Sequence, residues 1–287
     1  MSWTFGALFV GALLGWAWWG TTRDAMGVPA LARTNHRGAV IPTAAGLVVP
    51  LAVLFAAAAA TVVVGSRPGA AGEWSTLSAT AVVVSAGFAL LGLFDDLAGV
   101  GQSGGFRGHL RELRSARLTS GSIKLLGGAA LGVVVAARLP PFGPSGPAVL
   151  VVLRDGAIVA LAANLVNLFD RRPGRALKVA ATVFVAAAAV SRSAVLAMPA
   201  IGVGAGLGVL WPDLRERCML GDTGANALGG LCGVALLVAA PSGVARWIVL
   251  AVLVALNAMS ELVSFSRLID AVPPLRWVDR LGVSPSR

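Results

Sequence analysis

Long apolar runs separated by short polar segments are the main pattern of this 287-residue chain. A transmembrane helix needs about 20 mostly apolar residues, and helices that pack inside protein can be somewhat shorter. By this measure the candidate spans are residues 3–20, 41–64, 75–94, 121–138, 148–167, 178–191, 195–211, 223–240 and 244–264. The pattern therefore predicts an all-α protein, a polytopic transmembrane helical bundle of about nine to ten helices.

The basic residues orient these spans. The first span has no basic residue before it and Arg23 after it, so we expect it to be retained with the N-terminus outside. Threading the other spans from there places most of the 23 lysines and arginines on the cytoplasmic side. This arrangement agrees with the positive-inside rule. The loops that carry candidate chemistry are then cytoplasmic.

Composition supports the membrane assignment. The chain is 57% apolar and 13% charged, whereas a soluble domain is nearer half apolar and a quarter charged. The formal net charge of +10 is explained by topology and attraction to anionic lipids, so no nucleic-acid partner is expected. We predict one integral membrane domain over residues 1–264 and a cytoplasmic basic amphipathic tail over 265–287. The chain is rich in arginine, alanine, valine and glycine, which is typical of a high-GC genome. We therefore expect a multi-pass protein of a bacterial cell (plasma) membrane.

Four aspartates stand at the ends of spans. Asp95 and Asp96 end the third, Asp170 follows the fifth, and Asp222 precedes the eighth. In the predicted topology all four lie at the cytoplasmic side. Carboxylates at such positions are costly unless they meet a cation, each other or water, so they indicate a functional site that could hold a metal.

Other polar residues join them at the same side. Lys124 is one of only two lysines, and Asn164, Asn167 and Asp170 are spaced to lie on roughly one helix face. The remaining candidates are His36, Arg171, Arg172 and Arg175. Each also has a purely structural interpretation: the aspartates as helix caps, the asparagines as contacts between helices, the basic residues as interfacial anchors, and His36 as a lone interfacial histidine.

The order of the motifs resembles that of a known family. The segments NHRGAVIPTAAG, LFDDLAG, SIKLL, NLVNLFD and MLGDTGANALGG follow one another over roughly residues 34–235. They resemble the polyprenyl-phosphate N-acetylhexosamine-1-phosphate transferases, which include phospho-N-acetylmuramoyl-pentapeptide transferase and the GlcNAc-1-phosphate transferases. The resemblance implies Mg²⁺-dependent transfer of a sugar-1-phosphate from a UDP-sugar to a polyprenyl phosphate at the cytoplasmic membrane face, with release of UMP.

The resemblance also implies residue roles. Asp222 would ligate Mg²⁺, Asp95 and Asp96 would position or deprotonate the lipid phosphate, and Lys124 would neutralise phosphate charge. Asp170 would act with them as a catalytic residue or organise the metal site. The residues expected to bind substrate are Asn164, Asn167, His36, Arg171, Arg172 and Arg175.

The chain departs from the family pattern in three ways. The family's Asp-Gly-x-Asp-Gly segment reads Asp170-Arg171-Arg172-Pro173-Gly174, the His-rich loop of the muramoyl-pentapeptide enzyme has no counterpart, and the nine spans are one short of the usual ten. These departures argue against the muramoyl-pentapeptide enzyme itself and favour a divergent branch with another or unknown donor sugar. A non-catalytic lipid-phosphate-binding homologue and a membrane transporter are the alternatives, and a homodimer is left open.

Overall fold

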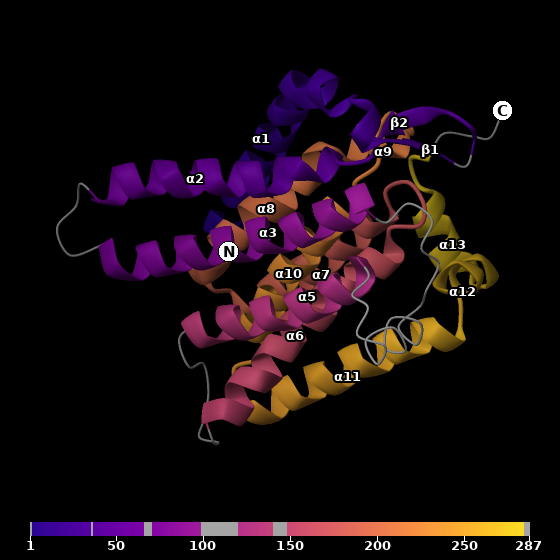
Figure 1. The fold of residues 1–287 in the computed structure, drawn as a ribbon. Coiled ribbons are helices and arrows are strands. Elements are labelled where there is room, and N and C mark those ends of the chain that lie inside the picture. The colour runs from indigo at the N-terminus through magenta and orange to yellow at the C-terminus, as the bar shows by residue number, and fades with distance from the viewer. Residues whose placement is uncertain (1, 36, 66–70, 99–119, 140–147, 284–287) are drawn as a thin grey trace.

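Helices dominate the computed structural model, which describes residues 2–35, 37–65, 71–98, 120–139 and 148–283 (Figure 1). The long helices are α1 (Ser2–Met26), α2 (Val48–Gly65), α3 (Ala71–Ala98), α5 (Ser120–Arg138), α6 (Ala148–Phe169), α7 (Arg175–Ser191), α8 (Ala197–Gly208), α10 (Gly221–Ala239) and α11 (Gly243–Leu262). The short elements are η1 (Pro29–Leu31), β1 (Ala32–Thr34), β2 (Val40–Pro42), η2 (Ala45–Leu47), η3 (Ala194–Leu196), α9 (Leu210–Leu214), α12 (Phe265–Ala271) and α13 (Pro273–Arg280).

Seven described segments are long and apolar enough to cross a membrane. They are Ala45–Val63, Thr76–Ala98, Ser120–Arg138, Ala148–Phe169, Ala194–Leu214, Gly221–Ala239 and Gly243–Leu262. This confirms the expected all-α bundle and indicates a multi-pass membrane protein. The helices α1 and α7 also follow predicted spans but are not among the seven, so the count of nine and the orientation remain predictions.

Two predicted spans differ from the structure in more than a shift of a few residues at their ends. The second begins at Ala45 instead of residue 41, because Val40–Pro42 pairs antiparallel with Ala32–Thr34. The turn of this hairpin contains Gly38 at φ +80°, a conformation that glycine adopts without a steric cost. The seventh corresponds to the single candidate span Ala194–Leu214, within which the helix is interrupted at Val209, between the end of α8 at Gly208 and the short helix α9.

The bundle is built around α10. Inside the protein, 78% of the α10 span is buried, against 11% for α11, so α10 is the central helix and α11 lies at the edge. The neighbours of α10 are α3, α6, α7 and α8 (Figure 1). Small residues allow such close packing in lipid. Along the contact of α1 with α8, for example, a Cβ at Gly11 would collide with the carbonyl oxygen of Ile201.

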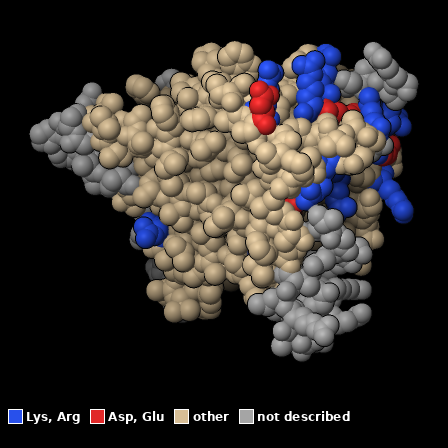
Figure 2. Space-filling model, turned by 45° about the horizontal axis from the view of Figure 1, so that its top comes forward, with Lys and Arg blue, Asp and Glu red and all other residues tan. Residues whose placement is uncertain are grey.

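Ionisable side chains gather at one end of the molecular face in Figure 2, and most of the remaining described surface of that face carries none. A buried group of ionic side chains lies in the N-terminal half of α6. Arg154 Nε donates to Asp155 Oδ1 at 2.8 Å, and Arg246 Nη1 of α11 donates to Asp155 Oδ2. A buried carboxylate needs such partners, and here they join α11 to α6.

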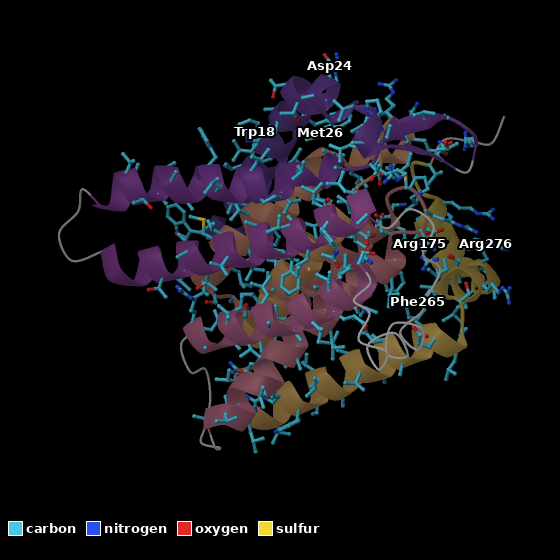
Figure 3. The ribbon with its side chains drawn as sticks, viewed as in Figure 1. Trp18, Asp24, Met26, Arg175, Phe265 and Arg276 are labelled. Atoms are coloured by element: carbon cyan, nitrogen blue, oxygen red, sulfur yellow. The ribbon has the colours of Figure 1, made fainter. Side chains whose placement is uncertain are left out.

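The C-terminal helices are held by the segment that follows α6. The guanidinium group of Arg175 (Figure 3) donates to both oxygens of Asp279 at 2.7 and 2.8 Å, and both side chains are buried. Arg172 forms a similar two-point contact with Asp270, but this pair is partly exposed. Lys178 Nζ donates to three carbonyl groups at the end of α13, at 2.8 to 3.0 Å. These contacts fix α12 and α13 against α7.

The exposed side of these two helices is apolar as well as basic. In α13, Trp277 is 66% exposed and Leu275 is also exposed, and in α12 Leu268 is exposed. Below them, the rings of Phe169 and Phe265 are stacked with centroids 4.8 Å apart. An exposed apolar stripe beside arginines fits the predicted amphipathic tail at a membrane surface, which stays a prediction.

The ion pair of Asp279 generates a testable contrast. We expect Asp279→Asn to destabilise the attachment of α12 and α13 by about 3 kcal/mol, because a buried Arg175 would lose its charged partner. Trypsin cleavage at Arg276 and Arg280 should then accelerate by roughly tenfold or more. Asp270→Asn is the matched control, since its pair is exposed and should contribute less than about 1 kcal/mol. Equal cleavage rates in the two variants would contradict this assignment.

The same ion pair sets a direction for pH dependence. Burial acts to raise the pKa of Asp279, but the hydrogen bonds and charge of Arg175, with the charges of Arg172 and Lys178, outweigh it and hold the pKa below its usual range. The stabilisation is therefore present above the ordinary aspartate pKa of about 3.9 and is lost as pH falls through the lower folded-state value. Tail release should accordingly appear only in acid.

Candidate active site

Three helix ends bring a lysine between two carboxylates. Asp95 lies in the last turn of α3, Lys124 in the first turns of α5, and Asp222 at the start of α10. Lys124 Nζ donates to Asp222 Oδ2 in a short contact and lies 3.4 Å from Asp95 Oδ2. The three side chains are largely but not fully buried. The ammonium group thus compensates two carboxylates in a partly desolvated place.

Asn167 completes this cluster from α6. Its amide orientation is assigned from the hydrogen bonds it can make: Nδ2 donates to Asp222 Oδ1 and Oδ1 accepts from Lys124 Nζ, both at 2.9 Å. The side chain therefore holds the lysine and the aspartate together. We name Asp95, Lys124, Asn167 and Asp222 the acid-lysine cluster.

Asp96 has a different environment from its neighbour Asp95. Its Oδ1 accepts the backbone N–H of Asp222 at 3.1 Å, and its Oδ2 accepts the backbone N–H and the hydroxyl of Thr223 at 3.0 and 2.7 Å. Free N–H groups at a helix start are stabilised by a carboxylate, and the helix dipole adds to this. Asp96 of α3 therefore caps α10, and its predicted role toward a lipid phosphate stays a prediction.

Close backbone contact makes this cap possible. A Cβ at Gly92 would collide with the carbonyl oxygen of Asp222, and one at Gly221 would collide with that of Thr43. Gly221 also has φ +71°, a value that other residues rarely adopt. Arg33 of the hairpin donates from Nη2 to the backbone carbonyl of Asp96 in a short contact. The end of α3 is thus held from both sides.

Asp170 lies just after α6 and close to the same group. Burial raises the pKa of its carboxyl group well above the usual range, and the charges of Asp213, Asp222 and Asp96 raise it further, against a hydrogen bond from the Gly221 N–H. Asp213, in α9, accepts the N–H of Gly174 at 2.7 Å. This contact fixes the turn where the sequence departs from the family pattern.

The other predicted substrate-binding residues have separate positions. Arg172 and Arg175 form the ion pairs with the C-terminal helices, Arg171 is exposed, and His36 lies outside the described residues. Asn164 Nδ2 donates to Asn257 Oδ1 of α11 at 2.7 Å. Their predicted contacts with substrate are therefore not tested by these positions.

An apolar cavity of about 710 Å³ extends from the lysine. Its lining comes from α3, α5, α6, α10 and α11, mostly as apolar side chains such as Leu91, Val133 and Leu153. The polar members include Lys124, Asn164, Asn226, Asn257, Ser260 and Glu261. We name this cavity the lateral groove. Because Lys124 belongs both to it and to the acid-lysine cluster, the two are continuous.

The side-chain oxygens of the acid-lysine cluster are of the kind that bind a hard cation such as Mg²⁺. Over the part of the chain that the structure describes, no three His, Cys, Asp or Glu side chains are grouped as metal ligands. However, oxygens of Asp95, Asp222 and Asn167 converge on the Lys124 ammonium group. Carboxylate and amide oxygens are the ligands that Mg²⁺ takes in proteins, and the ammonium group occupies the place between them.

In comparisons with known proteins, no family model and no curated relative matches the chain. The family resemblance therefore rests on the motifs and their order alone.

Several residues of the site were not singled out from the sequence. Asp213 carried a usable signal, because it follows the end of an apolar run, as the four singled-out aspartates also stand at the ends of such runs. Thr223 follows an aspartate at a helix start and could have been considered for capping. Arg33 and Asn257 gave no comparable signal, since each acts on a helix distant in sequence.

The cap on α10 can be tested through Thr223. Thr223→Val removes one donor to a carboxylate and should destabilise the protein by about 2 kcal/mol. Thr61→Val is the control, because the Thr61 hydroxyl donates only to Ala57 within its own helix. Thermal unfolding in detergent should show a clear decrease in Tm for the first variant and little change for the second. Similar Tm values for both would argue against the cap.

Proposed function

We propose that this protein is a phosphoglycosyl transferase that moves a sugar-1-phosphate from a UDP-sugar to a polyprenyl phosphate at the cytoplasmic membrane face and releases UMP. One observation carries the proposal: Lys124, the cation of the acid-lysine cluster, also lines the lateral groove. A cluster that can manage phosphate charge therefore adjoins an apolar space open to a lipid chain. The order of sequence motifs supports the same reaction.

The lateral groove fits the acceptor. Polyprenyl chains are apolar, and the lining of the groove is mostly aliphatic side chains and small residues. It runs between α5, α6 and α11, and α11 is the helix that the protein buries least. An acceptor lying there would have its phosphate at Lys124, where charge compensation is available.

The reaction needs few covalent contributions from the protein. An oxygen of the lipid phosphate would attack the phosphorus that carries the sugar, and the bond from that phosphorus to the bridging oxygen of UMP would break. Lys124 would neutralise charge on the phosphates, and Asp95 would orient the acceptor phosphate or take its proton. Asp96 would act as a positioning residue, because its oxygens are engaged in the cap of α10. Asn167 would orient Lys124 and Asp222.

Mg²⁺ is the cofactor that this proposal requires. Asp222 would hold it, with oxygens of Asp95 and Asn167 as further ligands. When bound, the ion would neutralise charge on the diphosphate of the donor. The Lys124 side chain would then be available for the acceptor phosphate.

A non-catalytic lipid-phosphate-binding protein is the second candidate, favoured by the segment after Asp170. Its arginines contact carboxylates of the C-terminal helices, so two of the predicted substrate cations are already engaged. Such a protein would use the lateral groove and Lys124 without turnover.

Turnover separates these candidates. Purified protein with Mg²⁺, undecaprenyl phosphate and a panel of UDP-sugars should release UMP with at least one donor, and a chelator should abolish the release. Asp222→Asn and Lys124→Gln should each lower the rate by about 100-fold or more, since each removes charge compensation in the transition state. Asp24→Asn is the control, because Asp24 is almost fully exposed in a loose pair with Arg23. Absence of UMP from every donor, beside an active reference enzyme, would overturn the proposal.

The acceptor position gives a separate prediction. Ala160→Phe would fill part of the lateral groove and should raise KM for the lipid acceptor, with kcat and KM for the UDP-sugar nearly unchanged. Val149→Phe on the same helix is the control, because Val149 is 69% exposed and lies outside the groove lining. An unchanged KM in the Ala160 variant would place the acceptor elsewhere.

A further inference from the structure

A second cavity of about 640 Å³ lies at the charged end of α1. Its walls come from α1, β2, α9 and the residues after α9. Three tryptophans contribute to the lining, together with two arginines: Trp16, Trp19, Trp211, Arg23 and Arg217. None of these residues belongs to the acid-lysine cluster or the lateral groove.

The residues that line the cavity are of the kind found at a membrane interface. Trp16 and Trp211 are 67% and 58% exposed although both lie in long apolar helical stretches. Tryptophan is enriched at the headgroup level of membranes, because its ring is apolar and its N–H is polar. Asp24 also lines the cavity, and Figure 3 shows it near the C-terminal end of α1. Ionisable side chains cluster at that end of the molecule (Figure 2).

The charge of the cavity is positive. The Arg23 side chain is 63% exposed and lies 3.6 Å from the carboxylate of Asp24, which is almost fully exposed, and exposed pairs of this kind contribute little. Arg217 is exposed, and within the described part of the chain no hydrogen bond or ion pair engages its guanidinium group. Arg215 adds a further positive charge over the Trp211 ring, 4.2 Å from its centroid. Two exposed arginines thus flank an aromatic wall.

We propose that this cavity binds an anionic phospholipid of the surrounding bilayer. Its phosphate would lie between Arg23 and Arg217, and an acyl chain would run along Trp16 and Trp19 of α1. Basic pockets between transmembrane helices at the cytoplasmic side suit such headgroups. Arginine forms two-point contacts with phosphate, and its apolar stem can lie along the aromatic wall.

The site would support the start of α10 from outside the cluster. Pro42 lines the cavity, and its carbonyl oxygen accepts the N–H of Met219 at 2.7 Å. The next residues continue this pairing, since Gly46 N–H donates to the Leu220 carbonyl at 3.0 Å. Asp222 follows two residues after Leu220. A lipid held between α1 and Arg217 would therefore stabilise both segments that lead into α10, whether or not the protein is an enzyme.

The test is lipid-dependent stability of the full chain in a nonionic detergent. Phosphatidylglycerol should raise Tm in a saturable way, and phosphatidylcholine should have little effect. Arg23→Gln with Arg217→Gln should shift half-saturation to about tenfold higher phosphatidylglycerol, whereas lysine at both positions should keep most of the response. Arg276→Gln with Arg280→Gln is the matched control, because it removes the same charge from the C-terminal helix.

Three results would overturn the proposal. An unchanged lipid response in the double glutamine variant would exclude the two arginines. An equal loss in the Arg276 and Arg280 control would show attraction by net charge alone. A response that depends on Lys124, tested with Lys124→Gln, would place the lipid in the lateral groove instead.

Discussion

The contact between the end of α3 and the start of α10 determines the rest of the candidate site. The carboxylate of Asp96 accepts three hydrogen bonds from the first residues of α10, which would otherwise leave free N–H groups at a buried helix end. Glycines at positions 92 and 221 permit the close approach. Because α10 is also the central helix of the bundle, this one contact joins the core to the charged end.

The cap leaves two adjacent aspartates with different environments. Asp96 is engaged with α10, so Asp95 is the carboxylate that meets Lys124 together with Asp222. Three side-chain oxygens thus surround the ammonium group of Lys124. The same oxygens could bind a divalent ion, and the ammonium group could contact a phosphate. The apolar lateral groove adjoins this charged cluster. The proposed acceptor has a matching structure, because a polyprenyl phosphate carries a charged phosphate on an apolar chain.

The sequence predicted the helices and their apolar character well, because span length and hydropathy are local properties. It also pointed to Asp95, Lys124 and Asp222, whose proximity in the structure comes from three separate helix ends. It could not separate Asp95 from Asp96, since that difference depends on which side chain faces α10. The ion pair of Arg175 with Asp279 was equally hidden, because more than a hundred residues of folded chain determine it.

The most direct test of the central claim is thermal protection by a nucleotide-sugar. With Mg²⁺ present, at least one UDP-sugar at saturating concentration should raise the Tm of the purified protein by about 3 °C or more, because ligands that bind only the folded state stabilise it. The protection should vanish without Mg²⁺ and in a variant with Asp222→Ala. No protection by any UDP-sugar, or full protection in that variant, would contradict a donor site at the acid-lysine cluster.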